Sequence, residues 1–525
     1  MQQVSQEWKD AQQQTIVPEC FIEVSMSVGI SNIGDMGTAS DNGHEAYANT
    51  AQTIDETDKE PLRYATLEKN IWALDGSFLI VPDEAPYGNN GYIGNLLSNE
   101  NGNFSVTPTL TITMPDAVQD LAPGITVTWG TAYGEYAESF RVSAYQGVTA
   151  TVPIYQQTVE NNSGISSVVI GDLQYYNKIT IEVLKWNKPY RRARIESVFV
   201  GIRKTYTKSE LISFSHRLFA DPLSAELPKA EIRFELANLN GEFNPDNPQG
   251  AERYLMERQE IKAKYGFRIG DAIEWIKCGT FYLSEWDTPQ NGITASFAAR
   301  DLLEYMNGLF VDPTASSQRF LSDVANAALS QANLPLNSDG TNRWTLHSSL
   351  GSILAADNMD LSNYTIAEVL QLAANAACCV FYQDRNGILH IDKLASASST
   401  DYIIDKDNCY SWPEINLSKQ LKEVNVNDGG AIVSVGTAGE TQKVDNIMIT
   451  PIPIFLQEKA VANWTAAYLK NRRVLSGEWR ADPRLDVLDR VTVENQFSES
   501  TVLITEIEYA YNGSFHGSFS GRAGV

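Results

Sequence analysis

Long apolar stretches and a signal-peptide pattern are both absent from this sequence. No uncharged apolar run approaches the about 18 residues that a membrane-spanning helix needs, and the N-terminus has no basic segment followed by an apolar core. These two absences predict no membrane insertion. We therefore expect a protein that is made in the cytoplasm and stays there, unless a machine that needs no signal peptide carries it out.

Cysteine and histidine are scarce, and their spacing fits neither a disulfide framework nor a metal site. The five cysteines are an odd number without regular spacing, which favours small buried thiols in a reducing compartment. The five histidines form no His-x3-His or His-Glu-x2-His pattern and are expected at the surface or as satisfied core residues. We predict no metal ligand and no cofactor.

Motifs of nucleophilic catalysis are missing as well. The sequence has no Gly-x-Ser-x-Gly elbow. The pair Cys378-Cys379 lies in an alanine-rich passage from a helix to a strand, which is typical of packing. Glycosidases use a pair of carboxylates, and Asp83-Glu84 is one pair of acidic neighbours in this sequence. With 65 acidic residues in the chain, however, such pairs are common by chance. We therefore predict no catalytic residue and no enzymatic activity.

Basic residues are the minority among the charged side chains. There are 65 acidic and 40 basic residues, which gives a formal net charge of −25. Such a surface repels nucleic acid and anionic membranes on average. The chain of 525 residues is expected to form about three or four domains.

The apolar pattern of the first half predicts a helical arm followed by a β-domain. In residues 1–19, Val4, Trp8 and Ala11 recur at helical spacing, and this short helix is expected to dock on another part of the chain. Residues 20–203 alternate apolar and polar positions in short bursts with no helix between them. This alternation is typical of a sandwich or barrel.

The second half combines strands with helices. Two-residue alternation continues over residues 204–312, and residues 313–400 contain two amphipathic helices followed by a hairpin with the turn Asp384-Arg-Asn-Gly387. Strands return over residues 401–525, interrupted by one helix. The predicted fold class is therefore mainly β with an α+β insert at 313–400.

A particular order of strands and turns marks the second half. One strand enters the turn Asn240-Gly-Glu-Phe243, where Gly241 supplies a positive φ. A second strand contains Gly279-Thr-Phe-Tyr-Leu-Ser-Glu, and Ala299-Arg-Asp-Leu-Leu-Glu-Tyr-Met enters a helix. Together with residues 485–493 and 511–515, this order resembles the trimeric baseplate hub family of tailed bacteriophages and related injection machines. The resemblance implies two hub β-barrel domains, at 204–312 and 401–525.

Three stretches of the first half also occur in a recognisable order. They are Tyr64 to Ser77, the strand Tyr176-Asn-Lys-Ile-Thr-Ile, and the strand Arg191-Arg-Ala-Arg-Ile that leads to Gly201. The order resembles a discoidin-like, galactose-binding-type jelly roll found in tail proteins of phages of Gram-positive bacteria. The resemblance implies a jelly-roll β-sandwich over residues 20–203.

Aromatic and polar residues near the strand ends of this first domain are candidate contact residues. A flat ring beside polar donors is the mixture that stacks on sugars and bonds to their hydroxyls. The same residues also fill sandwich ends or anchor protein interfaces, so glycan contact and packing both stay open. The candidates are Tyr87, Tyr92, Trp129, Tyr133, Tyr136, Trp186 and Arg191.

The two resemblances imply a structural virion protein, a tail-tip hub that closes or extends the tail tube. The implied partners are two further copies in a homotrimer, tail-tube or distal tail proteins and other baseplate proteins, with host cell-wall glycans as a further candidate. DNA would pass without specific binding, and the hub would be assembled in the host cytoplasm. Two alternatives stay open, a carbohydrate-binding adhesin and, with less support, a cell-wall hydrolase.

Overall fold

The computed structural model shows a mainly β protein with a smaller helical part. It describes residues 1–524 except 15, 17, 30–36, 56–60, 70, 72–75, 81–89, 120, 224–225, 245, 248–254, 256, 271, 288–291, 307, 338–340, 358, 395–401 and 451–455. The chain forms two compact units. Unit 1 comprises Met1–Ser25, Thr205–Pro335 and Asn342–Val525, and unit 2 comprises Met26–Lys204 and Leu336–Thr341. The predicted domain boundary at residue 203 lies next to Lys204.

Unit 2 is a β-sandwich built from two antiparallel sheets. The larger sheet has the order β2-β6-β11-β8-β9, and the smaller has the order β10-β7-β13. Alternate residues of the facing strands, among them Ile125, Val127, Ile179 and Ile181, are fully buried in one shared core. The predicted sandwich is thereby confirmed, while its jelly-roll topology stays a prediction.

The elements of unit 2 are short, as expected for strands that cross a small sandwich. They are β2 (Thr38–Asp41), η1 (Thr50–Ile54), β3 (Tyr64–Ala65), β4 (Leu79–Ile80), β5 (Tyr92–Leu97), β6 (Thr109–Val118), β7 (Ala122–Thr128), η2 (Thr131–Tyr133), β8 (Ala137–Tyr145), β9 (Tyr155–Val159), β10 (Ser166–Leu173), β11 (Tyr176–Trp186), β12 (Arg192–Ile195) and β13 (Ser197–Phe199). Two further strands, β1 (Cys20–Gly29) and β14 (Gly201–Tyr206), each begin in one unit and end in the other.

Unit 1 is organised by one long sheet. From β17 onward its strands follow the order β17-β18-β19-β16-β15-β30-β31-β28-β24, and β29 pairs with both β30 and β23. The strands are β15 (Leu211–Phe219), β16 (Lys229–Ala237), β17 (Glu260–Ile269), β18 (Ala272–Asp287), β19 (Thr294–Arg300), β23 (Ile403–Ile404), β24 (Glu414–Leu417), β28 (Arg473–Trp479), β29 (Arg490–Glu494), β30 (Glu499–Tyr511) and β31 (Phe515–Ala523).

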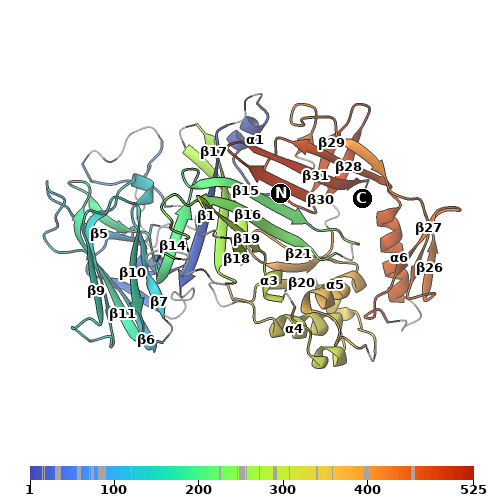
Figure 1. Cartoon of the computed structure of the whole chain (residues 1–525), viewed down its shortest axis with the longest axis horizontal. Coiled ribbons are helices and arrows are strands. Elements are labelled where there is room, and N and C mark those ends of the chain that lie inside the picture. The colour runs from blue at the N-terminus through green and yellow to red at the C-terminus, as the bar shows by residue number, and fades with distance from the viewer. Residues whose placement is uncertain are drawn as a thin grey trace. The chain divides into compact units, whose positions relative to one another are not determined.

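The pairing of β15 with β30 joins the two segments that the sequence predicts as separate barrels. His216 lies opposite Tyr509 and Leu218 lies opposite Ile507 in this antiparallel pair. Figure 1 shows the green strands β15 and β16 beside the red strands β30 and β31. Residues 204–312 and 401–525 therefore share one hydrogen-bonded sheet. The barrel assignment of each segment stays a prediction.

The α+β insert packs its helices and a three-stranded sheet into a core that also contains residues of the C-terminal region, among them Val424 and Val461. Its elements are η4 (Pro313–Ser317), α4 (Leu321–Gln331), β20 (Trp344–Leu346), η5 (Ser348–Ser352), α5 (Ile366–Ala376), β21 (Val380–Gln383) and β22 (Leu389–Asp392), and the short helix α3 (Leu303–Met306) precedes it. Helix α5 begins at a capping box, in which Thr365 and Glu368 each satisfy a backbone N–H of the other. The predicted helices and the β21–β22 hairpin are confirmed.

The C-terminal region adds a small sheet and a helix to unit 1. They are β25 (Leu421–Val426), β26 (Ala431–Ser434), β27 (Glu440–Val444) and α6 (Leu456–Leu469). The N-terminal helix α1 (Gln6–Gln12) docks on the same unit, because Trp8 is fully buried and its ring lies 4.8 Å from that of Phe267. The expectation that this short helix docks is thereby confirmed.

Gly241 has the positive φ that the sequence predicts, 64°, in the turn after β16. An added Cβ would meet only Asn244 at 3.7 Å, so backbone strain and not crowding opposes a side chain. We expect Gly241→Val to lower the free energy of unfolding by about 1–3 kcal/mol. Chemical denaturation of the full chain measures this loss. Gly241→Asn is the matched control, because asparagine tolerates this conformation, and equal losses in both variants would contradict the turn assignment.

Candidate functional site

Three of the candidate residues of unit 2 lie inside the sandwich. Tyr92 and Trp129 are fully buried, and Trp186 is 1% exposed. The ring of Trp129 packs edge-on against Phe140 at 4.9 Å and against Trp186 at 6.2 Å. In this structure these residues offer no surface to a ligand and serve as core residues. Tyr87 lies outside the described residues.

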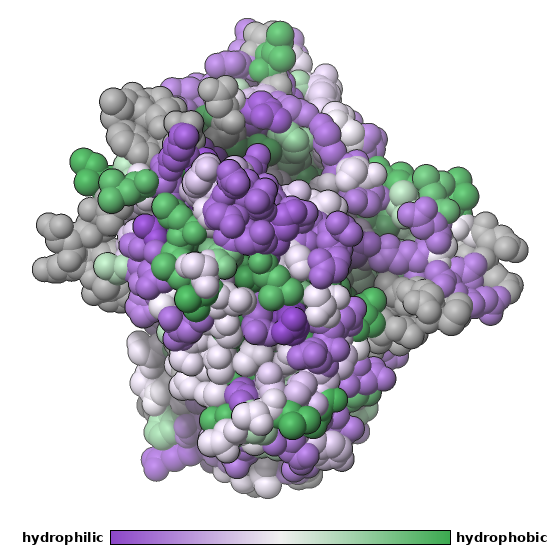
Figure 2. Space-filling view, turned by 90° about the vertical axis from the view of Figure 1, so that its left-hand side faces the viewer, coloured by the Kyte–Doolittle hydropathy of each residue, from purple (hydrophilic) through white to green (hydrophobic). Residues whose placement is uncertain are grey.

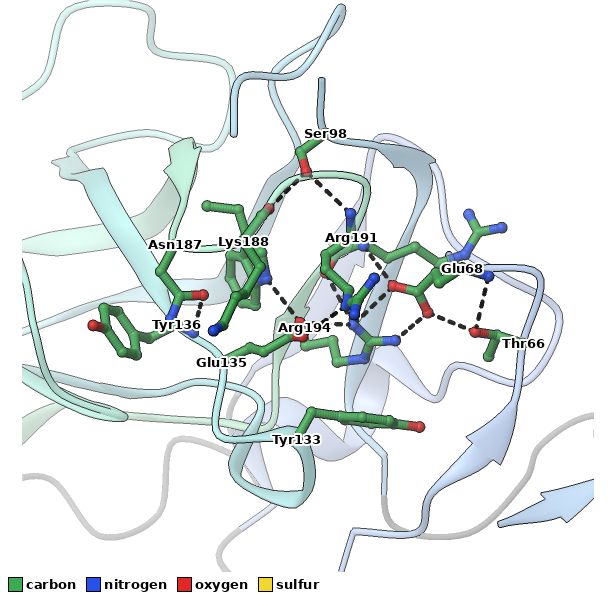
Figure 3. Close-up of polar contacts among 12 residues, drawn as sticks. Thr66, Glu68, Ser98, Tyr133, Glu135, Tyr136, Asn187, Lys188, Arg191 and Arg194 are labelled. Atoms are coloured by element: carbon green, nitrogen blue, oxygen red, sulfur yellow. Dashed lines mark hydrogen bonds and ion pairs between the residues drawn. The ribbon is translucent and has the colours of Figure 1, made fainter. Parts of the chain in front are cut away.

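The remaining candidates surround a buried ionic network, which Figure 3 shows in detail. Tyr133 lies beneath the Arg194 guanidinium, whose carbon is 4.3 Å from the ring centre. Arg191 donates from Nε to Glu135 over 2.8 Å. The backbone N–H of Tyr136 donates to Asn187 over 3.2 Å. These contacts come from the η2 loop and from the turn that connects β11 to β12.

The centre of the network is the ion pair of Arg194 with Glu68. The guanidinium donates twice, over 3.1 Å and 2.5 Å, and the side chains are 3% and 0% exposed. Glu68 also accepts from the Thr66 hydroxyl over 2.7 Å and from the Arg192 backbone N–H over 2.8 Å. Burial alone raises the pKa of Glu68, but the charge and hydrogen bonds of Arg194 outweigh it and lower that pKa.

Glu135 extends this network toward the surface. Its carboxylate lies 2.8 Å from Arg191 Nε and 3.5 Å from Arg194 Nη1, and it accepts from Trp186 Nε1 over 3.1 Å. Two arginines thus alternate with two glutamates, and every carboxylate has a cation beside it. The charges balance and the groups are held in place, so the network fixes loops and offers no free acid or base.

A third buried carboxylate ties the η2 loop to the junction between β12 and β13. Glu196 accepts from the backbone N–H and the hydroxyl of Thr131, over 2.7 Å and 2.6 Å. Burial raises the pKa of Glu196 to about 7, against the lowering effect of these hydrogen bonds. A raised pKa in a cleft can indicate a catalytic acid, but both oxygens of this carboxylate already bind the loop. Its role here is to position the loop that carries Tyr133.

Unit 1 contains a cluster of chemically reactive residue types, deep in its sheet. His216 is fully buried, and its Nδ1 lies 2.6 Å from the Tyr265 hydroxyl and 3.2 Å from Cys278 Sγ. Burial lowers the pKa of His216 well below its usual value and raises the pKa of Cys278 to about 12. The imidazole is therefore neutral and the thiol protonated, which leaves no thiolate for covalent chemistry at this cluster.

Among the described residues, no three His, Cys, Asp or Glu side chains are grouped closely enough to hold a metal ion. In the same part of the chain, no helix has the length and apolar character required to cross a membrane.

The end of the long sheet in unit 1 carries an exposed apolar strand. All residues of β24 are exposed, with Ile415 at 40% and Leu417 at 64%. Just before the strand, Tyr410 and Trp412 are 61% and 40% exposed. Strand β24 pairs with β28 on one side and, among the described strands, has no neighbour on the other. We call these four residues the β24 edge.

Exposed apolar side chains along an unpaired edge are unusual for a chain that remains alone. Natural proteins protect such edges with lysines, prolines, bulges or a covering segment, because the free N–H and C=O groups pair readily with another strand. Exposed apolar residues also occur on β10, an end strand of the smaller sheet of unit 2, where Val168 and Ile170 are 37% and 48% exposed. Figure 2 shows one face of the molecule on which hydrophobic residues form small groups between hydrophilic ones. The β24 edge is therefore a candidate interaction surface.

Comparison with known proteins gives similarities to tail proteins. The sequence matches no family model and no curated protein. The chain is similar to the 43 kDa tail protein of prophage MuSo2 from Shewanella oneidensis, with 12% identity, a TM-score of 0.43 and coverage of 61% of this chain and 94% of that chain. It is similar to a tail protein from Neisseria meningitidis MC58, with 11% identity, a TM-score of 0.44 and coverage of 61% and 93%.

A third similarity is to an E. coli protein described as a component of the type VI secretion system. It has 10% identity and a TM-score of 0.36, and the match covers 60% of this chain and 74% of that chain. TM-scores below 0.5 leave all three as similarities only.

Sequence reasoning missed both the ionic network and the β24 edge. Glu68 and Arg194 are 126 positions apart, and no local pattern links them. The alternation of Glu414, Ile415, Asn416 and Leu417 does predict a strand, but it cannot show that the strand lies at the end of a sheet. Glycan contact stays a prediction for Tyr133, Tyr136 and Arg191.

Proposed function

We propose that this chain is a non-enzymatic structural protein of a phage tail tip, a baseplate hub subunit that forms a closed ring with two other copies. The ring closes or extends the tail tube and binds tail-tube, distal tail and other baseplate proteins. The subunit is assembled in the host cytoplasm and acts in the virion. The sequence resemblance of residues 205–525 to the baseplate hub family is the starting point.

The observation that carries the proposal is the β24 edge. Its unpaired backbone and its apolar residues Ile415 and Leu417 suit pairing with a strand or surface of another chain. Contact between different surfaces of identical chains must either close into a ring or polymerise. A ring is therefore the arrangement in which such an edge is used without forming fibres.

The stretches that carry the hub resemblance belong to one framework, which supports the proposal. The turn at Gly241 follows β16, Gly279 lies in β18, and residues 299–306 run from β19 into α3. Residues 485–493 lead into β29, which pairs with β30. All these strands belong to the same sheet of unit 1. A sheet shared in this way gives a rigid subunit, as a ring around a tube requires.

The charge of the chain suits a passage for DNA. With a net charge of −25, its surface repels phosphates on average, so a genome slides past instead of binding. Contact of unit 2 with host glycans is a secondary part of the proposal. The burial of Trp129 and Trp186 disfavours the adhesin alternative, since those rings cannot stack on a sugar.

Copy number in an assembled particle tests the proposal. Cryo-electron microscopy of tails that contain this chain should show three copies around the tail axis, with the sixfold tail tube in the same map as the internal standard. Free chains are a weaker test, because assembly can depend on the tail as a template. Six copies on a true sixfold axis, or a single copy without a symmetry partner, would overturn the hub assignment.

A further inference from the structure

Unit 1 has a pocket between α5 and α6 that the proposed function does not explain. It has a volume of about 490 Å³ and is lined by residues of both helices, of β27, of β31 and of the segment after β15. This size lies in the range of about 300–1,000 Å³ that is usual for small-molecule sites. We call it the α5–α6 pocket and describe it by Tyr364, Asn375, Trp464, Thr465, Tyr468 and Arg522.

Among the buried polar atoms of this pocket that lack a hydrogen-bond partner in the described residues are the hydroxyl oxygen of Thr465, a residue that is 2% exposed, and the amide oxygen of Asn375. A buried polar atom without a partner costs stability, and most such atoms in folded proteins are satisfied. Both residues line the same pocket. Because both oxygens lack a hydrogen bond, the pocket is suited to a polar ligand that supplies these bonds.

The aromatic residues of the pocket add flat apolar surfaces beside these polar atoms. Trp464 of α6 and Tyr364 before α5 are each partly exposed. Tyr468 is 3% exposed, and the Arg522 guanidinium carbon lies 5.2 Å from its ring centre. Arg522 is held by a hydrogen bond of 2.7 Å from Nη1 to the Asn471 carbonyl. The rings are therefore part of a supported wall and not of a loose surface.

The charges around the pocket disfavour an anionic ligand. Three acidic residues, Asp221, Glu368 and Asp445, face two basic ones, Lys443 and Arg522. Lys443 also lies 3.5 Å from Asp428, which further reduces the positive charge available to a ligand. An uncharged ligand with hydroxyl groups can bond to the polar atoms, and it needs no excess of positive charge around the pocket.

We propose that the α5–α6 pocket binds a neutral sugar. Sugar hydroxyls both donate and accept, so they can pair with the Thr465 hydroxyl and the Asn375 amide, while a sugar face stacks on Trp464 or Tyr364. This site lies in unit 1 and is separate from the predicted glycan contacts of unit 2. It does not depend on the hub assignment, and a monomeric chain has the whole pocket.

Titration of the full chain with glucose, galactose, N-acetylglucosamine and N-acetylgalactosamine, followed by saturation-transfer NMR, tests the proposal. At least one sugar should bind saturably. Trp464→Ala should weaken that binding by at least about tenfold, the effect of losing one good contact. The matched control is Trp412→Ala, because Trp412 is 40% exposed on the β24 edge, and it should leave sugar binding within about twofold of the wild type.

Thr465→Val separates a ligand contact from a structural role. Valine has nearly the same shape and removes the unpaired hydroxyl, so the sugar-free chain should melt at the same or a higher temperature. Sugar binding should nevertheless fall by about tenfold. Absence of saturable binding to all four sugars, or equal binding by the Thr465→Val and Trp464→Ala variants and the wild type, would overturn the proposal. Density for a segment of a neighbouring protein in the pocket of an assembled particle would also overturn it.

Discussion

Replacing Arg194 with methionine is expected to lower the free energy of unfolding of unit 2 by about 3–5 kcal/mol. The substitution keeps much of the side-chain volume but removes the guanidinium that, among the described residues, pairs with Glu68, a side chain that is 0% exposed. Glu68 then retains hydrogen bonds from Thr66 and Arg192 without a compensating charge. A buried carboxylate left in this state is the source of the large loss.

Hydrogen exchange of the peptides that contain β11 and β12, measured in the full chain, reports the loss in the free energy of unfolding of unit 2. Arg141→Met is the matched control, because the Arg141–Glu182 pair spans 3.4 Å with side chains that are 36% and 28% exposed. Such a pair contributes about 0–1 kcal/mol. The double replacement of Arg194 by Met and Glu68 by Leu should recover most of the stability, since it leaves no unpaired charge. A single Arg194→Met variant as stable as the control would contradict the central role of the network.

The pH dependence of this loss has a definite sign. In the wild type the pKa of Glu68 is lowered, so its stabilisation is present above the unfolded pKa of about 4.3 and is lost as pH falls through the lower folded pKa. In Arg194→Met, burial without a cation raises the pKa of Glu68 instead. The carboxyl then becomes protonated on mild acidification, and the difference between variant and wild type should shrink as pH falls from about 7 to about 4.

Local patterns in the sequence predict the strands of unit 2 but assign some side chains to the wrong surroundings. Ile125, Val127 and Trp129 occur at every second position, so one face of the strand carries all three. That periodicity indicates a core position for Trp129, where the structure has it, whereas its place just beyond the end of β7 led to its prediction as a contact residue. Trp186 is harder to place, because the register of β11 against β8 shifts between Val183 and Lys185, and a bulge breaks the two-residue period.

Long-range pairing is the part of the fold that no local pattern contains. The alternation in residues 211–219 and 499–511 predicts two strands, but not that β15 and β30 are neighbours. That choice depends on the fit of buried rings far apart in the chain, such as Tyr265 with Tyr509 at 5.6 Å and His216 with Tyr509 at 6.2 Å. The helices were easier to predict, because caps such as Thr365 with Glu368 act within one turn.

Replacing Ile415 and Leu417 together with lysine is expected to abolish ring assembly while the chain still folds. Both side chains are exposed, at 40% and 64%, so the substitutions should change the free energy of unfolding by only about 0.5 kcal/mol each. Lysines along an edge strand are a common means of preventing strand-to-strand association. A contact that buries this edge would have to desolvate two new charges, and that cost opposes the contact in every subunit of the ring.

Incorporation of the variant into assembled tails measures the effect, with wild-type protein as the reference. The double variant should be absent from purified particles although its melting temperature is unchanged. Leu239→Lys is the matched control, because Leu239 is 78% exposed and lies in the turn after β16, a strand that is paired on both sides, with β15 and β19. It should assemble normally. Particles that contain the double variant at wild-type copy number would show that ring contacts lie elsewhere, whereas three copies of the wild type would still support the hub.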